Sequence, residues 1–393
     1  MFDARSGGVA LALLLCSMGC TESAVSGVHH PAALLPDDCA VAVGWDRALD
    51  FEIPHGLELL RGAPQGVRES LCRDSGSFGG RLVKGQEEPD IVAPTERVGL
   101  GKVRWFREAL AGLEVPGPGT TFAVDIRGFR KWPGTSKMLG QLPGVASFLS
   151  AALWVGPSGN GTRECRAFTR LARMPVGIAK IFNVEPAQLQ LPRLLLPVAD
   201  GASWLCVRAD PSAVVNTLQA MIAGIGFGAF GPGPSEILRG LRGGFVFRRE
   251  VWEAAGREAA IVIPEWGKAI VVISVRDRDT LLSVARETSG LSGRMRIVLD
   301  EDGPAPIARV DGFGRGVIAV LGRSFVAIGR VADEKVLLAI LERERDERRP
   351  GLPFAAPELL NAVGQVRVSG QVVCFWTKRT ATGLCARGTL QKH

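Results

Sequence analysis

Nucleophilic catalysis by serine or cysteine usually depends on a histidine base, and this chain offers few histidines for that role. It contains four, His29, His30, His55 and His393, and it has no tyrosine. The first two fall in a segment expected to be a tether, and the fourth is the last residue. His55 is therefore the one histidine expected within the folded part, and its Pro and Gly neighbours are typical of a solvated loop.

Paired carboxylates could perform acid–base chemistry without histidine. Acidic residues cluster at 87–90 (Glu-Glu-Pro-Asp) and at 300–302 (Asp-Glu-Asp). We interpret the first cluster as a solvated loop. The second is typical of a hairpin tip, with Gly303 in a left-handed turn. A Ca²⁺ site at Asp300 and Asp302 is an alternative, although further ligands of a known calcium loop are missing.

A phosphate-binding glycine loop is the third chemistry to consider. Residues 226–231 match G-x-G-x-x-G, but that motif binds dinucleotides only between a strand and a helix. Here a helical pattern precedes the glycines and Pro-Gly-Pro follows them. No Walker A, G-x-S-x-G or H-E-x-x-H motif occurs. We therefore expect no catalytic residues, no cofactor and no metal.

The eight cysteines are candidates for disulfide bonds. Cys16 and Cys20 belong to an N-terminal export-like segment, which leaves six for the folded part. An even number in an exported chain favours disulfides. Local patterns favour the pairs Cys39–Cys72, Cys165–Cys206 and Cys374–Cys385, the last of them across a hairpin. Buried free thiols are the alternative.

The N-terminal segment carries the most informative pattern in the chain. A short polar start is followed by an apolar run at 7–15, too short to span a bilayer, and then by Ser17-Met18-Gly19-Cys20. This resembles the lipobox of bacterial lipoproteins, although Ser17 replaces the usual Leu. The resemblance implies cleavage before Cys20 and attachment of diacylglycerol to its thiol. An ordinary signal peptide and a soluble secreted protein are the alternative.

The residues after Cys20 resemble a tether, since 21–36 are rich in Ser, Gly, His and Pro without periodicity. Sixteen residues reach at most about 50 Å, so the folded part is expected close to the membrane. Thr21 is not the Asp that commonly retains lipoproteins at an inner membrane. We therefore expect a lipid-anchored protein of the cell envelope, at the outer membrane and facing the periplasm or the cell surface.

Composition is that of a globular protein, with 46% hydrophobic and 22% charged residues. The formal net charge is +7, and Arg is scattered along the chain. Such a balance can attract anionic lipid, an envelope polymer or nucleic acid. The export signal argues against nucleic acid. A charge bias without a partner is the simplest interpretation.

Five apolar, β-prone runs recur, each followed by a polar break and a helical stretch. They are residues 39–45, 121–126, 204–207, 270–275 and 325–328. Short hairpin-like connections at 157–162, 300–303 and 322–324 favour antiparallel pairing. We expect an α+β fold in which antiparallel sheets carry helices packed on one face. Two related lobes would be built from repeated strand–helix units.

The helices have recognisable starts. Asp210-Pro211 supplies an N-cap carboxylate and a proline at the first helical position. Apolar faces at helical spacing follow it, and also follow Asp279 and Asp333. The Glu- and Arg-rich residues 342–349 are typical of an exposed helix end.

These patterns divide the chain into five parts: a signal peptide at 1–19, a lipid-anchored tether at 20–36, an N-terminal α+β lobe at 37–225, a Gly/Pro-rich linker or loop at 226–244 and a C-terminal α+β lobe at 245–393. The stretch 211–235 carries no charge. A core helix followed by a loop explains it best. An apolar contact loop at Ile225, Phe227 and Phe230, touching lipid or an apolar ligand, is the alternative.

Leu35-Pro36-Asp37-Asp38 before the first strand resembles the opening of a class of large exported bacterial domains of unknown function. That resemblance implies an envelope location and no activity. We expect a non-catalytic envelope lipoprotein that acts as a binding or scaffolding module at the membrane surface. Its partners would be the membrane, through the lipid, and an unknown envelope protein or apolar ligand, with no nucleic acid. The alternatives are a periplasmic carrier or chaperone for an apolar ligand or lipoprotein, and a carboxylate-dependent hydrolase.

Overall fold

The computed structural model describes the chain in sections. The described residues are 30–45, 76–81, 90–95, 99–115, 117–131, 144–195, 202–214, 216, 248–265, 268–289, 296–303, 305–311, 316–344, 352, 354–368 and 371–392. They contain sixteen strands in antiparallel ladders, which confirms the antiparallel α+β prediction. The chain forms two compact units, residues 1–179 with 368–393 (unit 1) and residues 180–367 (unit 2). The predicted linker at 226–244 lies outside the described residues, and the relatedness of the units stays a prediction.

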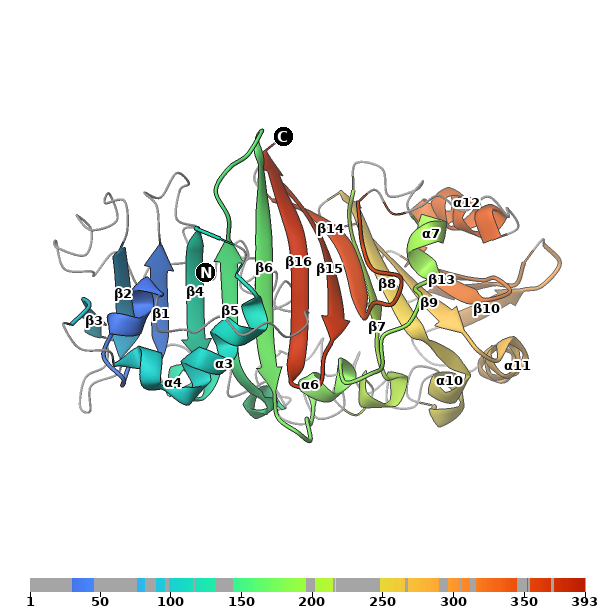
Figure 1. Cartoon of the computed structure of the whole chain (residues 1–393). Helices are drawn as coiled ribbons and strands as arrows, with labels where there is room; N and C mark the ends of the chain where they lie inside the picture. Colours follow the sequence, from blue (N-terminus) through green and yellow to red (C-terminus); the bar gives the residue numbers. More distant parts are fainter. Residues whose placement is uncertain are drawn as a thin grey trace. The chain divides into compact units, whose positions relative to one another are not determined.

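Unit 1 is built on one antiparallel sheet in which the last two strands of the chain join the first six (Figure 1). Its strands are β1 (Val41–Trp45), β2 (Gly76–Arg81), β3 (Asp90–Val92), β4 (Thr120–Asp125), β5 (Phe148–Val155), β6 (Thr162–Leu171), β15 (Gln371–Arg379) and β16 (Gly383–Lys392). Their order is β15-β16-β6-β5-β4-β1-β2-β3. The predicted hairpin between β5 and β6 is confirmed.

Helix α3 (Arg104–Leu113) covers β4, β5 and β6. Its buried residues Phe106, Leu110 and Leu113 recur at helical spacing and therefore lie on one side of the helix. They pack against Trp154 of β5 and Phe168 of β6. Burying a side chain of this size contributes roughly 1.5–3 kcal/mol, so this layer supplies much of the stability of unit 1.

The residues before β1 are folded onto unit 1. Ala32, Ala33 and Leu35 are at most 1% exposed, in or beside the short helix η2 (Pro31–Leu34). The Nδ1 atom of His30 accepts a hydrogen bond from the Ala32 N–H at 3.2 Å, and the ring meets Phe106 of α3 edge-on at 5.9 Å. Residues 30–36, predicted as tether, therefore belong to the fold, and a tether can extend no further than residue 29.

Short helices complete unit 1 and lead into unit 2. They are η4 (Leu100–Lys102), α4 (Ile126–Phe129), η5 (Val145–Ser147) and α6 (Ile178–Ile181), which spans the unit boundary. The α4 helix begins where β4 ends, because the Asp125 carboxylate accepts the N–H groups of Arg127 and Gly128, both at 3.2 Å.

Unit 2 contains a second antiparallel ladder. Its strands are β7 (Ser203–Arg208), β8 (Ala255–Glu265), β9 (Lys268–Val275), β10 (Arg296–Asp300), β11 (Ile307–Asp311), β12 (Val317–Leu321), β13 (Phe325–Arg330) and β14 (Ala362–Val368), in the order β10-β11-β12-β13-β9-β8-β7-β14. Its helices are α7 (Leu191–Leu195), α10 (Arg249–Ala254), α11 (Arg278–Thr288), η7 (Val331–Asp333) and α12 (Glu334–Glu344). The predicted hairpins at 300–303 and 322–324 are confirmed.

Helices contact both faces of the sheet in unit 2, so the prediction of one helical face is wrong there. Leu321 of β12 packs against the α10–α11 cluster that contains Val284. Ile318 lies on the opposite face of the same strand and pairs with Gly329 of β13. A Cβ atom added at Gly329 would lie 3.5 Å from Leu337 of α12, so α12 covers that face. The physical reason is visible in β9, where an unbroken apolar run gives both faces a surface to bury.

Candidate functional site

Several residues that the sequence singled out lie outside the described residues. They are Cys20, Cys72, His55, Ile225, Phe227 and Phe230. Lipidation at Cys20, the Cys39–Cys72 pair and the apolar contact loop therefore stay predictions.

The register of β15 and β16 does not support the predicted Cys374–Cys385 disulfide. Cys374 is opposite Thr389, and Cys385 is opposite Lys378. The two cysteines are thus four strand positions apart, about 13 Å, whereas a disulfide requires Cα atoms within about 7 Å. The turn at 380–382 is the reason, since it lies much nearer to Cys385 than to Cys374.

Two of the other cysteines, Cys39 and Cys206, are buried free thiols in the described part of the chain. Cys165 and Cys206 lie in different units, so their pairing stays a prediction. Burial raises the pKa of the Cys39 thiol to about 12 and raises that of Cys206 well above its ordinary value. Because the thiolate is the nucleophile, these two thiols are unreactive at neutral pH.

The acidic cluster at 300–302 is held in ion pairs at the tip of the β10–β11 hairpin. Arg286 donates two hydrogen bonds to the Glu301 carboxylate, at 2.8 and 2.5 Å, and these lower the pKa of Glu301. Asp300 lies 3.6 Å from Arg309 and accepts the Asp302 N–H at 3.2 Å. A general acid needs a raised pKa, so Glu301 is poorly suited to that role.

The first acidic cluster is only partly described. Asp90 accepts a hydrogen bond from Arg81 at 3.1 Å, and Arg81 also pairs with Asp38 at 3.3 Å. These contacts tie β2, β3 and the residues before β1 together. Asp90 therefore has a structural role in unit 1.

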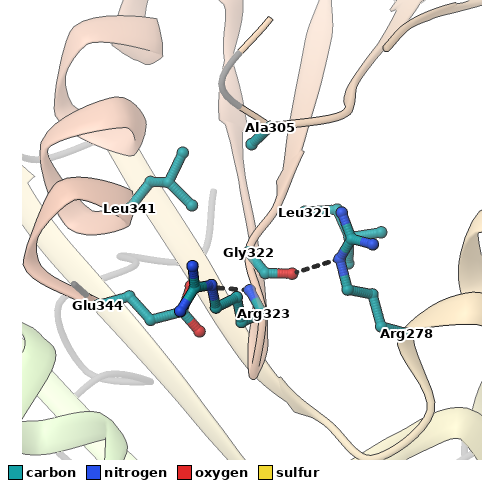
Figure 2. A pocket seen from close by; sticks show the side chains of 7 residues that line it. All are labelled: Arg278, Ala305, Leu321, Gly322, Arg323, Leu341 and Glu344. Carbon is teal, nitrogen blue, oxygen red and sulfur yellow. Dashed lines mark hydrogen bonds between the residues drawn. The ribbon is translucent and has the colours of Figure 1, made fainter.

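A surface hollow in unit 2 is the best candidate site among the described residues (Figure 2). It has a volume of about 320 Å³ and lies at the turn between β12 and β13. Its lining consists of Arg278, Ala305, Leu321, Gly322, Arg323, Leu341 and Glu344. Side chains from α11, α12 and the turn itself thus combine two guanidinium groups with an apolar surface.

Hydrogen bonds connect the turn that lines the hollow to two helices. Glu344, the last residue of α12, accepts the N–H groups of Arg323 at 2.7 Å and of Ser324 at 2.5 Å, and the Ser324 hydroxyl at 2.7 Å. From the start of α11, Arg278 Nε donates to the Gly322 carbonyl at 3.1 Å. Fixing the turn from both sides makes the lining rigid before any ligand binds, which reduces the entropic cost of binding.

The chemistry of this lining is that of anion binding. Among the described residues, the Arg278 guanidinium donates a hydrogen bond only through Nε, although its charge also lowers the pKa of Glu301. Arg323 is exposed. Guanidinium groups bind carboxylate and phosphate through paired hydrogen bonds. Leu321 and Leu341 offer an apolar contact beside them. The sequence indicated only an exposed charged helix end at 342–349, since nothing local shows that Glu344 reaches the β12–β13 turn.

No protein-family model, curated protein or solved structure matches this chain. Every helix in the described part of the chain is too short or too polar to span a bilayer. Over those same residues, no three His, Cys, Asp or Glu side chains gather in a way that could hold a metal ion. The hollow is therefore interpreted from its own residues.

A buried carboxylate that the sequence did not single out lies elsewhere in unit 2. Glu258 of β8 is 8% exposed, and it accepts the N–H groups of Gln190 at 2.8 Å and Leu191 at 3.1 Å. Amides at the start of a helix have no acceptor within the helix, so a carboxylate that accepts them stabilises α7. Glu258 therefore fixes α7 on the sheet.

Replacing this carboxylate tests that role. We expect Glu258→Ala to lower the free energy of unfolding by roughly 2 kcal/mol, because the buried Leu191 amide loses its acceptor. Glu258→Gln keeps an acceptor oxygen and should lose clearly less. Urea denaturation of both variants measures the difference, and equal losses would contradict the capping role.

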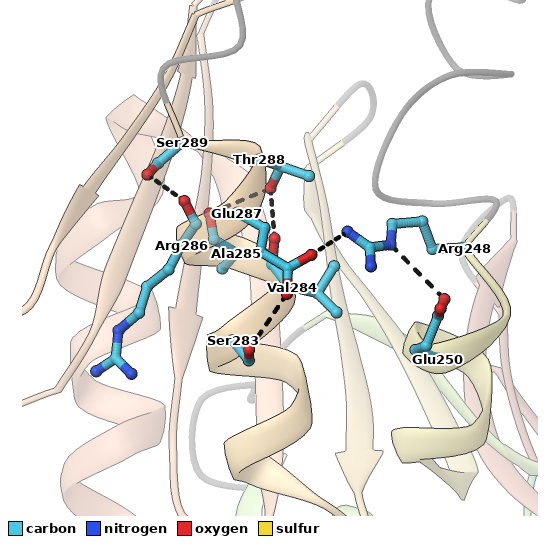
Figure 3. Close-up of polar contacts among 9 residues, drawn as sticks. All are labelled: Arg248, Glu250, Ser283, Val284, Ala285, Arg286, Glu287, Thr288 and Ser289. Carbon is cyan, nitrogen blue, oxygen red and sulfur yellow. Dashed lines mark hydrogen bonds and ion pairs between the residues drawn. The ribbon is translucent and has the colours of Figure 1, made fainter.

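An exposed ion-pair network connects α10 and α11 (Figure 3). Arg248 donates to Glu287 at 2.7 Å and lies 3.6 Å from Glu250, and Ser283 contacts Glu287 at 3.5 Å. The hydrogen bond to Glu287 raises the pKa of Arg248. Exposed pairs of this kind contribute little stability, and since each carboxylate here has a cation partner, we assign the network no chemistry.

Proposed function

We propose that this chain is a non-catalytic lipoprotein of the cell envelope that acts as a binding or scaffolding module at the membrane surface. The observation that carries the binding role is the hollow of unit 2. The envelope location rests on the lipobox-like segment that ends in Cys20.

The hollow favours binding over catalysis because of how its groups are used. Its one carboxylate, Glu344, accepts hydrogen bonds from Arg323 and Ser324 and so has little capacity left for proton transfer. The guanidinium groups of Arg278 and Arg323 bind anions but are too basic to exchange protons near neutral pH. The partner we infer therefore presents a carboxylate or phosphate next to an apolar group.

The two alternatives have less support. The hydrolase hypothesis needs a free carboxylate pair, whereas Asp90, Asp300 and Glu301 are engaged by arginines. The carrier hypothesis rests on the apolar loop at 225–230, which lies outside the described residues and stays a prediction.

Mass spectrometry of the native N-terminus tests the location. We expect the mature chain to begin at Cys20 with a diacylglyceryl thioether on its sulfur. An intact N-terminus, or a mature chain without acylation, would contradict the lipoprotein proposal.

Site-specific photo-crosslinking in intact envelopes tests the binding role. A photoreactive residue in place of the exposed Gly303, beside the lining residue Ala305, should give a discrete crosslinked product, whereas one in place of the exposed Arg173 of unit 1 should not. Arg278→Gln keeps donor groups but removes the charge, so we expect about tenfold less product from position 303. Identical products from positions 303 and 173, or a yield that Arg278→Gln leaves unchanged, would rule out the hollow as the binding site.

A further inference from the structure

One surface of unit 1 is strongly basic. Five exposed cations lie on η4, α3 and α4 or directly after α4: Lys102, Arg104, Arg107, Arg127 and Lys131. Both α3 and α4 contact β4 and β5, and Figure 1 shows them in front of the same sheet. Arg104 and Arg107 are three residues apart, so they share the outer side of α3, opposite the buried Phe106 and Leu110.

The acidic residues within 99–115 and 117–131 neutralise this surface only at Arg104, because they are otherwise used inside unit 1. Glu108 pairs with Arg170 of β6 as well as with Arg104, and Glu114 pairs with Arg387 of β16. Asp125 caps α4. The exposed acids of the neighbouring segment are Asp37 and Asp38, of which Asp38 pairs with Arg81. A net positive surface therefore remains.

The N-terminal segment enters the fold beside η4 and against the buried side of α3. The ring of His30 packs against Phe106 of α3, and η2 contacts η4. Ten residues separate Cys20 from His30, a distance of at most about 35 Å when fully extended. A diacylglyceryl group on Cys20 would therefore hold His30, and the helix α3 against which it packs, close to the bilayer.

We propose that the basic surface of η4, α3 and α4 contacts the anionic phospholipid headgroups beside the lipid anchor. This inference rests on the proposed envelope location and adds to it an orientation of unit 1. Each Lys or Arg near an anionic surface strengthens binding, and the attraction declines within a Debye length. A diacylglyceryl group carries two acyl chains and so anchors the protein stably by itself. The basic surface would add an orientation of unit 1 at the membrane.

Vesicle co-sedimentation of the mature chain from Cys20, produced without acylation, tests the surface independently of the lipid. We expect binding to vesicles that contain phosphatidylglycerol, little binding to pure phosphatidylcholine, and weakening as salt is raised. Reversing Lys102, Arg107, Arg127 and Lys131 to Glu should weaken binding by at least roughly 1,000-fold. The matched control reverses four exposed cations elsewhere, Arg173, Lys180, Arg276 and Lys335, which changes the net charge equally.

The outcomes separate the possible sources of binding. Equal losses in both variants would show a net-charge effect and would overturn the proposal, as would equal binding to both kinds of vesicle. Binding to soluble dextran sulfate without binding to the anionic vesicles would also overturn it, in favour of an envelope polymer. Circular dichroism and thermal unfolding must show both variants folded. An unacylated native N-terminus would contradict the lipoprotein proposal. Binding of the unacylated chain to anionic vesicles would still support the basic surface as a membrane contact.

Discussion

Gly112→Ala is expected to destabilise unit 1 even though alanine is the better helix former. Gly112 lies in α3, where alanine would favour the helix by about 1 kcal/mol. A Cβ atom at this position would lie 2.3 Å from Cγ of Phe168, whose ring is 2% exposed and fixed between α3 and the sheet. The overlap outweighs the helix propensity, and we expect a net loss of about 2 kcal/mol in the free energy of unfolding.

Urea denaturation with an unchanged m-value measures this loss. Gly159→Ala is the matched control, because no atom lies within 4 Å of the added Cβ there, and it should change stability by less than about 0.5 kcal/mol. Phe168→Leu added to Gly112→Ala makes room and should restore part of the loss. A Gly112→Ala protein more stable than wild type would contradict the packing of α3 on β6.

Acid should destabilise unit 1 through His30. Burial lowers the pKa of this imidazole from 6.5 to about 4, and its Nδ1 must stay unprotonated to accept the Ala32 N–H. The unfolded chain therefore binds the proton more readily than the folded one. The stabilisation is complete above pH 6.5 and declines as the pH falls from 6.5 to 4, by roughly 3 kcal/mol in all.

The free energy of unfolding measured from pH 7 to pH 4 tests this effect. His30→Asn keeps a side chain that can cap η2 but cannot become charged, so the difference between wild type and variant isolates His30 from the carboxylates that titrate nearby. We expect the variant to lose less stability than wild type over this range. Parallel curves for the two proteins would show that His30 is not buried as described.

Local interactions explain which elements could be predicted. The turn at 322–324 follows from a Gly-Arg-Ser break between two apolar runs, and the structure has β12 and β13 on either side of it. The start of α11 was expected at Asp279, whereas Asp277 caps the helix by accepting the Thr280 N–H at 3.0 Å. Two acidic residues lie close together there, and only the hydrogen bond distinguishes them.

The candidate site could not be predicted, because its parts come from separate elements. Arg278 begins α11, Arg323 lies in the β12–β13 turn and Glu344 ends α12. Each is an ordinary charged surface residue in its own segment. Their convergence depends on how α11 and α12 pack on opposite faces of the sheet, which no sequence spacing encodes.

The amino-acid sequence alone predicted the hairpins and the helix-forming runs, because each depends on a few consecutive residues. The prediction of export rests on the sequence for the same reason. The tertiary structure decided the rest. It placed β16 beside β6, which is far from it in the sequence, buried His30 against α3, and separated Cys374 from Cys385 along one hairpin. Such pairings are chosen by the apolar surface and hydrogen bonds of the whole unit, and many distant partners would satisfy the local pattern equally well.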